Sequence, residues 1–319
     1  MPSLTRFLDN NPALSTILPP CASATVTTLL LAFAGIGFLI AALEFTGARR
    51  ERASWFRCAK QVAVLSLILG WILLIGIRVW LFFNSDGYVP QSFLGSVIEL
   101  SWGALGFAVV TASLHFAVWK FLENHRVLHG CLALLIGING VTATAALLGS
   151  LRMLTALDLP NASQLTIADL YNFALVPSPL VAATALLVPL CLAMPASAAA
   201  VWLCARRNRD NFGRDYYNTM LPWCCRWALV LWIITTILSA LVVAGEAVGL
   251  NAAAPIAPSP AEIALWALRV VPSIVACVIY GLAARSATPM RFEGALWVAL
   301  LCCMPAAAFL SYDATSFLF

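Results

Sequence analysis

A chain of 319 residues in which 62% are hydrophobic and only 10% are charged, with a mean hydropathy of +0.93, cannot be a soluble globular domain, because a soluble fold of this size has too little interior for that much apolar surface. The formal net charge of +4 comes from basic residues gathered in particular loops, which indicates membrane topology and not nucleic-acid binding. The composition therefore predicts an integral membrane protein with lipid as its main solvent and no nucleic-acid partner.

Eight apolar segments along the chain are close to the 20 residues that an α-helix needs to cross the hydrocarbon core of a bilayer. They predict an all-α bundle of eight transmembrane helices. In chain order the segments are 24–43, 61–83, 94–119, 128–150, 178–204, 222–247, 261–284 and 294–311.

Basic residues are concentrated in every second connection between the predicted helices. They are concentrated at 49–60, 120–126, 206–214 and 285–291, whereas the intervening connections and the N-terminal arm carry little beyond Arg6 and Arg152. Basic loops stay on the cytoplasmic side of a membrane. We therefore expect a multi-pass protein of the bacterial cytoplasmic (inner) membrane with both termini on the outer, periplasmic side.

The connections on the outer side are too short to hold a separate domain. The chain is accordingly predicted to be a single transmembrane domain over 1–319, with an outer N-terminal arm at 1–23, the eight-helix bundle at 24–311 and an outer tail at 312–319.

Four ionisable residues lie within the outer half of the predicted helices, where burial is costly unless the charge is paired or hydrated. These are Arg78, Glu99, Glu246 and Arg269. Because 61–83 and 94–119 form a hairpin, Arg78 and Glu99 fall at similar depth and can form an ion pair. A group of two acids and two bases can hold a quinone head group and relay its protons. The alternative is that all four are structural ion pairs between helices.

The three histidines, His115, His125 and His129, all fall near the inner end of the helices at 94–119 and 128–150. Solvated histidines at the membrane interface are the favoured interpretation. A haem held by one of them, His115 or His129, with a methionine such as Met194 as the second ligand, is the less favoured alternative. The ten cysteines show no metal-binding spacing and are interpreted as small hydrophobes, so no metal ligand is predicted.

Several short stretches follow one another in an order that is similar to subunit I of the cytochrome bd family of quinol oxidases. Glu44 ends the first helix before a basic loop, and Gly95 and Glu99 open the third. The stretch Gly245-Glu246 resembles the start of the family's quinol-binding loop, and Arg269 stands where the family has an arginine close to a haem-ligand methionine. The resemblance covers about 24–313 and implies a bd-like scaffold.

The departures from this family concern its haem ligands. The resemblance places them at Ala24 to Thr28, at Ala183 or Thr184 and at Val271, and none of these side chains ligates iron. The family's last helix is missing, and its quinol loop shrinks to 248–260. The resemblance therefore implies a shortened relative that lacks the haem ligands, with haem not expected in this chain and quinone as the possible cofactor.

The leading hypothesis is a membrane subunit of a respiratory electron-transfer complex. It would be a bd-like scaffold without its own haems that anchors a haem-bearing partner, either a related oxidase subunit or a periplasmic cytochrome c, and that contributes to a quinone site near the outer face. Such a chain is at most a subunit of a quinol-linked oxidoreductase. Two alternatives remain open: a small-solute or proton-coupled transporter that uses the same four charges, and a membrane assembly factor.

Overall fold

A computed structural model describes residues 12–83, 93–156, 177–253 and 258–316, and over these ranges the chain is almost entirely helical. Eight of the helical stretches are long and apolar enough to cross a membrane. The helices are α2 (Pro12–Ala34), α3 (Ile36–Arg50), α4 (Ala53–Phe83), α5 (Phe93–Ala117), α6 (Arg126–Ala156), α8 (Pro177–Asp210), α9 (Arg214–Ala253), α10 (Pro260–Arg285) and α11 (Glu293–Ser316), with a 3₁₀ turn η3 (Pro289–Phe292) before the last.

The eight predicted membrane segments are confirmed, but most helices extend beyond them. α2 begins at Pro12, inside the predicted N-terminal arm, and α11 continues to Ser316, inside the predicted tail. Residues 1–11 and 317–319 of the arm and tail lie outside the described residues. α9 extends about eleven turns, or roughly 60 Å at 1.5 Å per residue, which is twice the thickness of a hydrocarbon core. Hydropathy marks the part of a helix that lies in lipid, and a helix continues past that part wherever capping or packing supports it.

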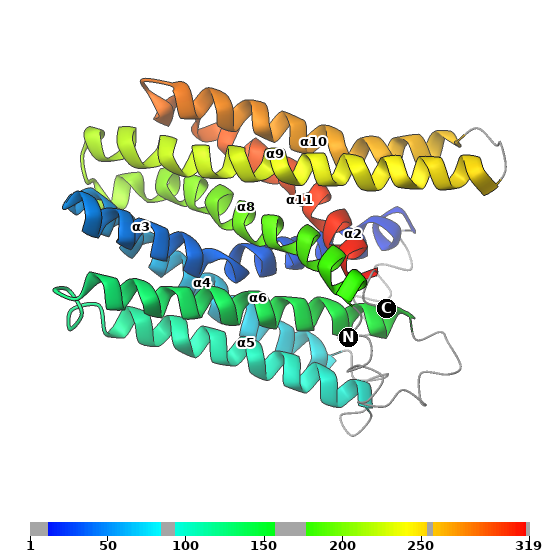
Figure 1. Cartoon of the computed structure of the whole chain (residues 1–319), viewed down its shortest axis with the longest axis horizontal. Helices are drawn as coiled ribbons and strands as arrows, with labels where there is room; N and C mark the ends of the chain where they lie inside the picture. The colour runs from blue at the N-terminus through cyan, green and yellow to red at the C-terminus, as the bar shows by residue number, and fades with distance from the viewer. Residues whose placement is uncertain (1–11, 84–92, 157–176, 254–257, 317–319) are drawn as a thin grey trace.

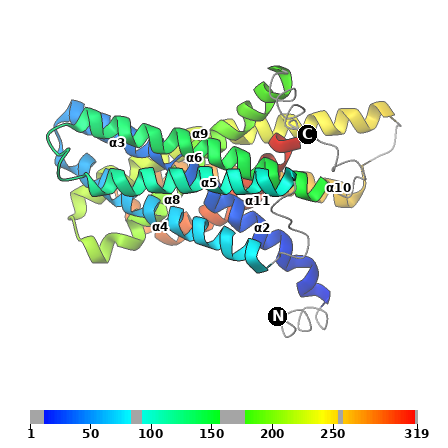
Figure 2. The same cartoon turned by 90° about the horizontal axis from the view of Figure 1, so that it is seen from below.

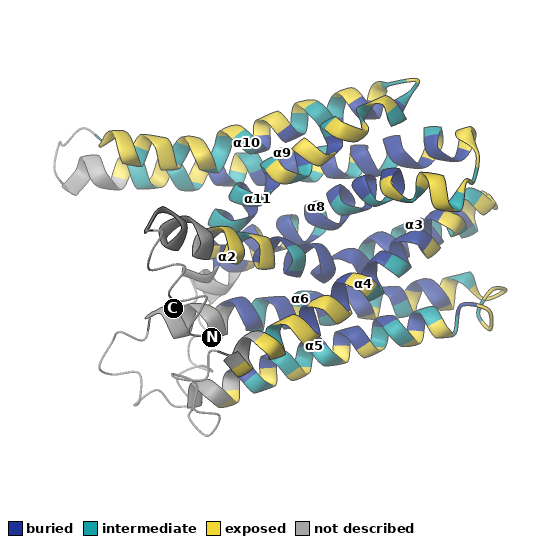
Figure 3. Ribbon diagram, turned by 180° about the vertical axis from the view of Figure 1, so that it is seen from behind, coloured by how far each residue is buried: buried dark blue, intermediate teal, exposed yellow. Residues whose placement is uncertain are grey.

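The helices run alternately up and down and form one bundle (Figure 1). The first and fifth membrane spans are at its centre, with 78% and 72% of their apolar windows buried, whereas only 22% and 17% of the α9 and α10 windows are buried. Figure 3 shows the consequence, with buried residues concentrated on α2, α3 and α8 and exposed ones along α4, α5, α9 and α10. The peripheral helices therefore present apolar side chains such as Ile233, Ile237 and Val278 to lipid.

Glycines allow the central helices to approach one another closely. The helix breaks at Gly35, between α2 and α3, where a Cβ would lie 1.5 Å from the carbonyl oxygen of Cys191 on α8. Two residues later, a Cβ at Gly37 would lie 2.2 Å from the backbone nitrogen of Gly137 on α6. Small residues at such contacts let helix backbones pack directly in a membrane, where no hydrophobic force drives the helices together.

A polar network ties α4, α8 and α9 together near the loops at one end of the bundle. The Gln61 side chain donates to Asp210 Oδ2 (2.6 Å) and accepts from the Tyr216 hydroxyl (2.5 Å). Arg206 donates two hydrogen bonds to the Asp210 carboxylate, at 2.9 and 2.8 Å, and Trp202 donates to the Gln61 carbonyl (2.9 Å). The buried Gln61 side chain is thus satisfied at both its oxygen and its nitrogen.

The two ends of the bundle differ in charge. The basic connections between α3 and α4, α5 and α6, α8 and α9, and α10 and α11 all lie at the left in Figure 1, while α2 begins and α11 ends at the right. The predicted alternation of loops is therefore present in the fold. We call the end with the basic connections the inner end, as the positive-inside rule predicts.

Candidate functional site

Three helices bring charged side chains together at the outer end of the bundle. Arg269 on α10 donates to Glu246 Oε1 on α9 at 2.5 Å, and Asp313 Oδ2 on α11 lies 3.7 Å from the same guanidinium nitrogen. Trp266, one turn before Arg269, donates its indole N–H to Glu246 Oε2 at 3.0 Å. The Arg269 guanidinium also lies over the ring of Phe309, 5.1 Å from its centroid. We call Glu246, Trp266, Arg269 and Asp313 the outer cluster.

The outer cluster lies near the outer boundary of the membrane. Along α9, Glu246 is about 30 Å from the exposed Arg226, and along α10, Arg269 is about 24 Å from Arg285 at the inner end. These spacings match the hydrocarbon thickness. The Arg269 side chain is 16% exposed and Asp313 only 12%, so their charges are largely shielded, while Glu246 at 39% reaches the surface. Both carboxylates thus approach the same guanidinium nitrogen, and Glu246 is the more exposed of the two.

Arg78 and Glu99 form an ion pair, as the hairpin of α4 and α5 predicts. The Arg78 guanidinium also lies 5.1 Å from the centroid of the Trp102 ring. With 51% of Arg78 and 34% of Glu99 exposed, this pair is much more open than the outer cluster.

The sequence predicts one group of four charges at a common depth, but the structure separates them into two pairs. α5 and α10 lie on opposite sides of the bundle (Figures 1 and 2), and α4 contacts α9 near the inner end, where Gln61 and Tyr216 meet, whereas both ion pairs lie toward the outer end. Arg78 pairs with Glu99, and Arg269 pairs with Glu246. Each ion pair therefore joins two helices that follow one another in the chain.

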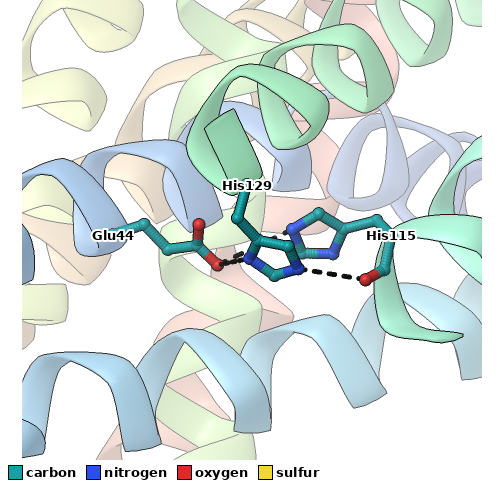
Figure 4. A group of neighbouring side chains, drawn as sticks. All are labelled: Glu44, His115 and His129. Carbon is teal, nitrogen blue, oxygen red and sulfur yellow. Dashed lines mark hydrogen bonds and ion pairs between the residues drawn. The ribbon is translucent and has the colours of Figure 1, made fainter. Parts of the chain in front are cut away.

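At the inner end, Glu44, His115 and His129 form a buried cluster that we call the inner triad (Figure 4). Glu44 lies near the end of α3, His115 near the end of α5 and His129 in the first turn of α6. Glu44 Oε1 is 2.5 Å from His129 Nδ1 and 3.6 Å from His115 Nε2. All three side chains are at most 1% exposed.

The rings of the inner triad are closely packed. His115 and His129 stack with centroids 3.9 Å apart and planes tilted by 23°. The buried Trp119 ring stands edge-on to both, at 5.7 Å from His115 and 4.6 Å from His129. Among the described residues, Glu44 Oε2 and both ring nitrogens of His115 have no hydrogen-bond partner. Buried polar atoms in this state are rare in folded proteins and call for an explanation.

The prediction of solvated interfacial histidines is wrong for His115 and His129 and correct only for His125, which is exposed. The reason is that α3 passes between the α5–α6 hairpin and α8, so that the ends of α5 and α6 close over Glu44. The Glu44 carboxylate in that position lies within hydrogen-bond distance of His129 Nδ1, which keeps the imidazole away from the interface.

The inner triad does not fit a haem held by both of its histidines, whereas the pairing of one of them with Met194, which is fully buried on α8, stays a prediction. Two axial histidines must hold an iron between their nitrogens, with their rings pointing at it from opposite sides. Here His115 and His129 are stacked face to face, and both His129 nitrogens are engaged, Nδ1 with Glu44 and Nε2 with the His115 carbonyl oxygen (3.0 Å).

The haem-ligand positions that the family resemblance gives do not fit haem either. Thr27, Thr28 and Ala183 are buried, and Val271 is 53% exposed on the outside of α10. Threonine, alanine and valine provide no axial ligand.

Sequence reasoning missed Glu44 and Asp313 as site residues. In the sequence, Glu44 was interpreted only as the end of the first helix. An ionisable residue within an apolar segment is, however, a candidate for a functional site. Asp313 was assigned to the tail because the last apolar segment ends at 311, whereas α11 runs one turn further.

Comparison with known proteins supports the fold. No family model and no curated protein matches the chain by sequence. A solved structure of bd oxidase from Geobacillus thermodenitrificans is similar over 94% of this chain and 86% of that chain, with a TM-score of 0.51 and 12% sequence identity. The chain is therefore a multi-pass helical membrane protein with a fold distantly similar to that of a bd oxidase.

Proposed function

We propose that this protein is a membrane subunit of a respiratory electron-transfer complex, a bd-like scaffold without haem ligands of its own. It anchors a haem-bearing partner and contributes the outer cluster to a quinone site. The observation that carries this proposal is the similarity in fold to a bd oxidase over 94% of the chain, combined with non-ligating residues at the haem positions.

The outer cluster has the chemistry that a quinone head group needs. A quinone carbonyl accepts hydrogen bonds, and the Arg269 guanidinium is a donor that stays charged in a low-dielectric setting. The carboxylates of the partly exposed Glu246 and the shielded Asp313 lie 2.5 and 3.7 Å from one nitrogen of the guanidinium. The rings of Trp266 and Phe309 add flat apolar surfaces beside it.

Quinol oxidation releases two electrons and two protons. In the proposed complex the electrons pass to the haem of the partner, and the protons pass to the two carboxylates, Glu246 and Asp313, before they leave at the outer surface. Arg78 and Glu99 remain a second candidate pair on the opposite edge. Their greater exposure makes them less suited to excluding water from a bound head group.

The test is purification of the tagged chain from its native membrane in mild detergent. Haem in the preparation is measured by its reduced-minus-oxidised spectrum, and quinone by solvent extraction and chromatography. We expect both to accompany the wild type. Glu246→Gln should lower the bound quinone at least about tenfold while haem is retained, because it removes a charged partner of Arg269.

Glu262→Gln is the matched control. Glu262 lies at the same end of α10 in a capping box with Ser259, a role that glutamine also performs. It should leave quinone content unchanged. Absence of both haem and quinone from the wild-type preparation would contradict the proposal. Solute flux in vesicles that Glu99→Gln abolishes would favour the transporter instead.

A further inference from the structure

The hydrogen bonds of His129 require a cation between its ring and Glu44. The His115 backbone carbonyl only accepts, so His129 Nε2 carries a proton and donates it at 3.0 Å. If the imidazole is neutral, Nδ1 then presents a lone pair to Glu44 Oε1, only 2.5 Å away. Two lone pairs at that distance repel each other. Either a proton or a metal ion must therefore lie between the two atoms.

A proton alone leaves the rest of the inner triad unexplained. It would satisfy Glu44 Oε1 and His129 Nδ1, but the His115 nitrogens and Glu44 Oε2 would stay buried without hydrogen bonds. His115 Nε2 lies 3.6 Å from Glu44 Oε1, beyond hydrogen-bond range. A group that uses all three residues at once accounts for more of these atoms than a single proton does.

We propose that Glu44, His115 and His129 bind a divalent transition-metal ion of the zinc type. One ligand atom from each of the three residues lies within 4.8 Å of the others. Two imidazoles and one carboxylate form a donor set that Zn²⁺ and Fe²⁺ both accept, with positions left open for a further ligand. The bond from His129 Nε2 to a backbone carbonyl is the outer contact that orients a metal-binding imidazole and leaves Nδ1 free to ligate.

Metal binding requires only small movements. Ligands of a tetrahedral ion with bonds of about 2.0–2.1 Å stand roughly 3.3 Å apart. Glu44 Oε1 would withdraw from His129 Nδ1 by about 0.8 Å from the present 2.5 Å. His115 would turn its ring out of the stack, and no hydrogen bond to its nitrogens opposes that turn among the described residues.

A pocket at the inner surface lies one helical turn away from the inner triad. It has a volume of about 940 Å³ and is lined by Gly47 and Ala48, one turn beyond Glu44, and by His125 and Arg126, one turn before His129. Trp119 packs edge-on against both rings. The inner triad therefore lies close to the inner surface of the bundle, although none of its three side chains lines this pocket. This inference does not depend on the proposed quinone chemistry.

The experiment measures metal in the full-length protein, purified in detergent and stripped with a strong chelator. Zn²⁺ alone is added back and counted by elemental analysis, and Co²⁺ alone is followed by its visible d–d absorption. We expect about one ion per chain, and at least a tenfold loss of affinity in His115→Gln, since loss of an outer contact alone costs that much. His125→Gln, which changes an exposed histidine in the connection between α5 and α6 outside the triad, should bind as the wild type does.

The wild-type measurement protects the test against a variant that fails to fold. If stripped wild-type protein takes up neither Zn²⁺ nor Co²⁺, the inner triad holds a proton and the proposal is overturned. It is overturned equally if a folded His115→Gln protein, judged by its elution as a single species, binds Co²⁺ with the wild-type spectrum and affinity.

Discussion

Replacing Gly37 with alanine should destabilise the bundle at the crossing of α3 and α6. The added Cβ would lie 2.2 Å from Gly137 N, 2.4 Å from the Ala133 carbonyl oxygen and 2.9 Å from Gly137 Cα. All three atoms belong to the backbone, so no side chain can turn aside. Because ordinary contacts begin near 3.4 Å, the two helices must separate by about 1 Å at this point.

The magnitude follows from the cost of overpacking a tight interior, which is about 1–3 kcal/mol. That corresponds to a loss of roughly 5-fold to 150-fold in the folding equilibrium, at about 1.4 kcal/mol per factor of ten. Moving α3 and α6 apart at Gly37 should also affect the inner triad. Glu44 lies two turns further along α3, and His129 lies about two turns back along the antiparallel α6. The same movement should therefore lengthen the contact between Glu44 and His129.

The assay is thermal unfolding in detergent, followed by tryptophan fluorescence. We expect the midpoint of Gly37→Ala to fall by at least about 2 °C. Gly103→Ala is the matched control, because nothing lies within 4 Å of a Cβ at this helical position. Alanine there should stabilise by about 0.5–1 kcal/mol through its better helix propensity. Equal midpoints for the two variants would refute the close-packing argument.

Three further predictions concern other parts of the chain. Gln61→Leu should lower stability by about 1–3 kcal/mol, because it leaves the buried hydroxyl of Tyr216 without its acceptor and removes one of the two hydrogen bonds to Asp210 Oδ2, and the same unfolding assay measures it. Glu99→Gln should change stability by less than about 1 kcal/mol, since its ion pair is half-exposed, and a loss above 3 kcal/mol would contradict this. Alkaline phosphatase fused after Phe319 should be active and a fusion after Arg209 inactive, whereas the reverse pattern would invert the topology.

The membrane helices could be predicted from the sequence because lipid imposes a simple rule: every backbone group must be bonded within its own helix, and some 20 residues must be apolar. The rule gives no information about the parts that project beyond the lipid. The end of α11 at Ser316 and the length of α9 were therefore not predictable from hydropathy.

Of the charged sites, one could be predicted from the sequence and another could not. The pairing of Arg78 with Glu99 was predictable because a short hairpin connection places two residues at one depth. The inner triad was not, because Glu44 and His129 are 85 positions apart in the chain and meet only through the packing of α3 against α6. No local pattern records which helices become neighbours. The glycines that set this packing, Gly37 and Gly137, have no signature of their own in a sequence so rich in small residues.

The central claim is that this bd-like scaffold works with a haem that another chain carries. The most direct measurement is a reduced-minus-oxidised spectrum of the complex purified from native membrane through a tag on this chain, followed by the spectrum of the separated subunits. The account predicts a haem signal in the complex that stays entirely with the partner. A haem signal that remains with this chain after separation, or its absence from the complex altogether, would contradict it.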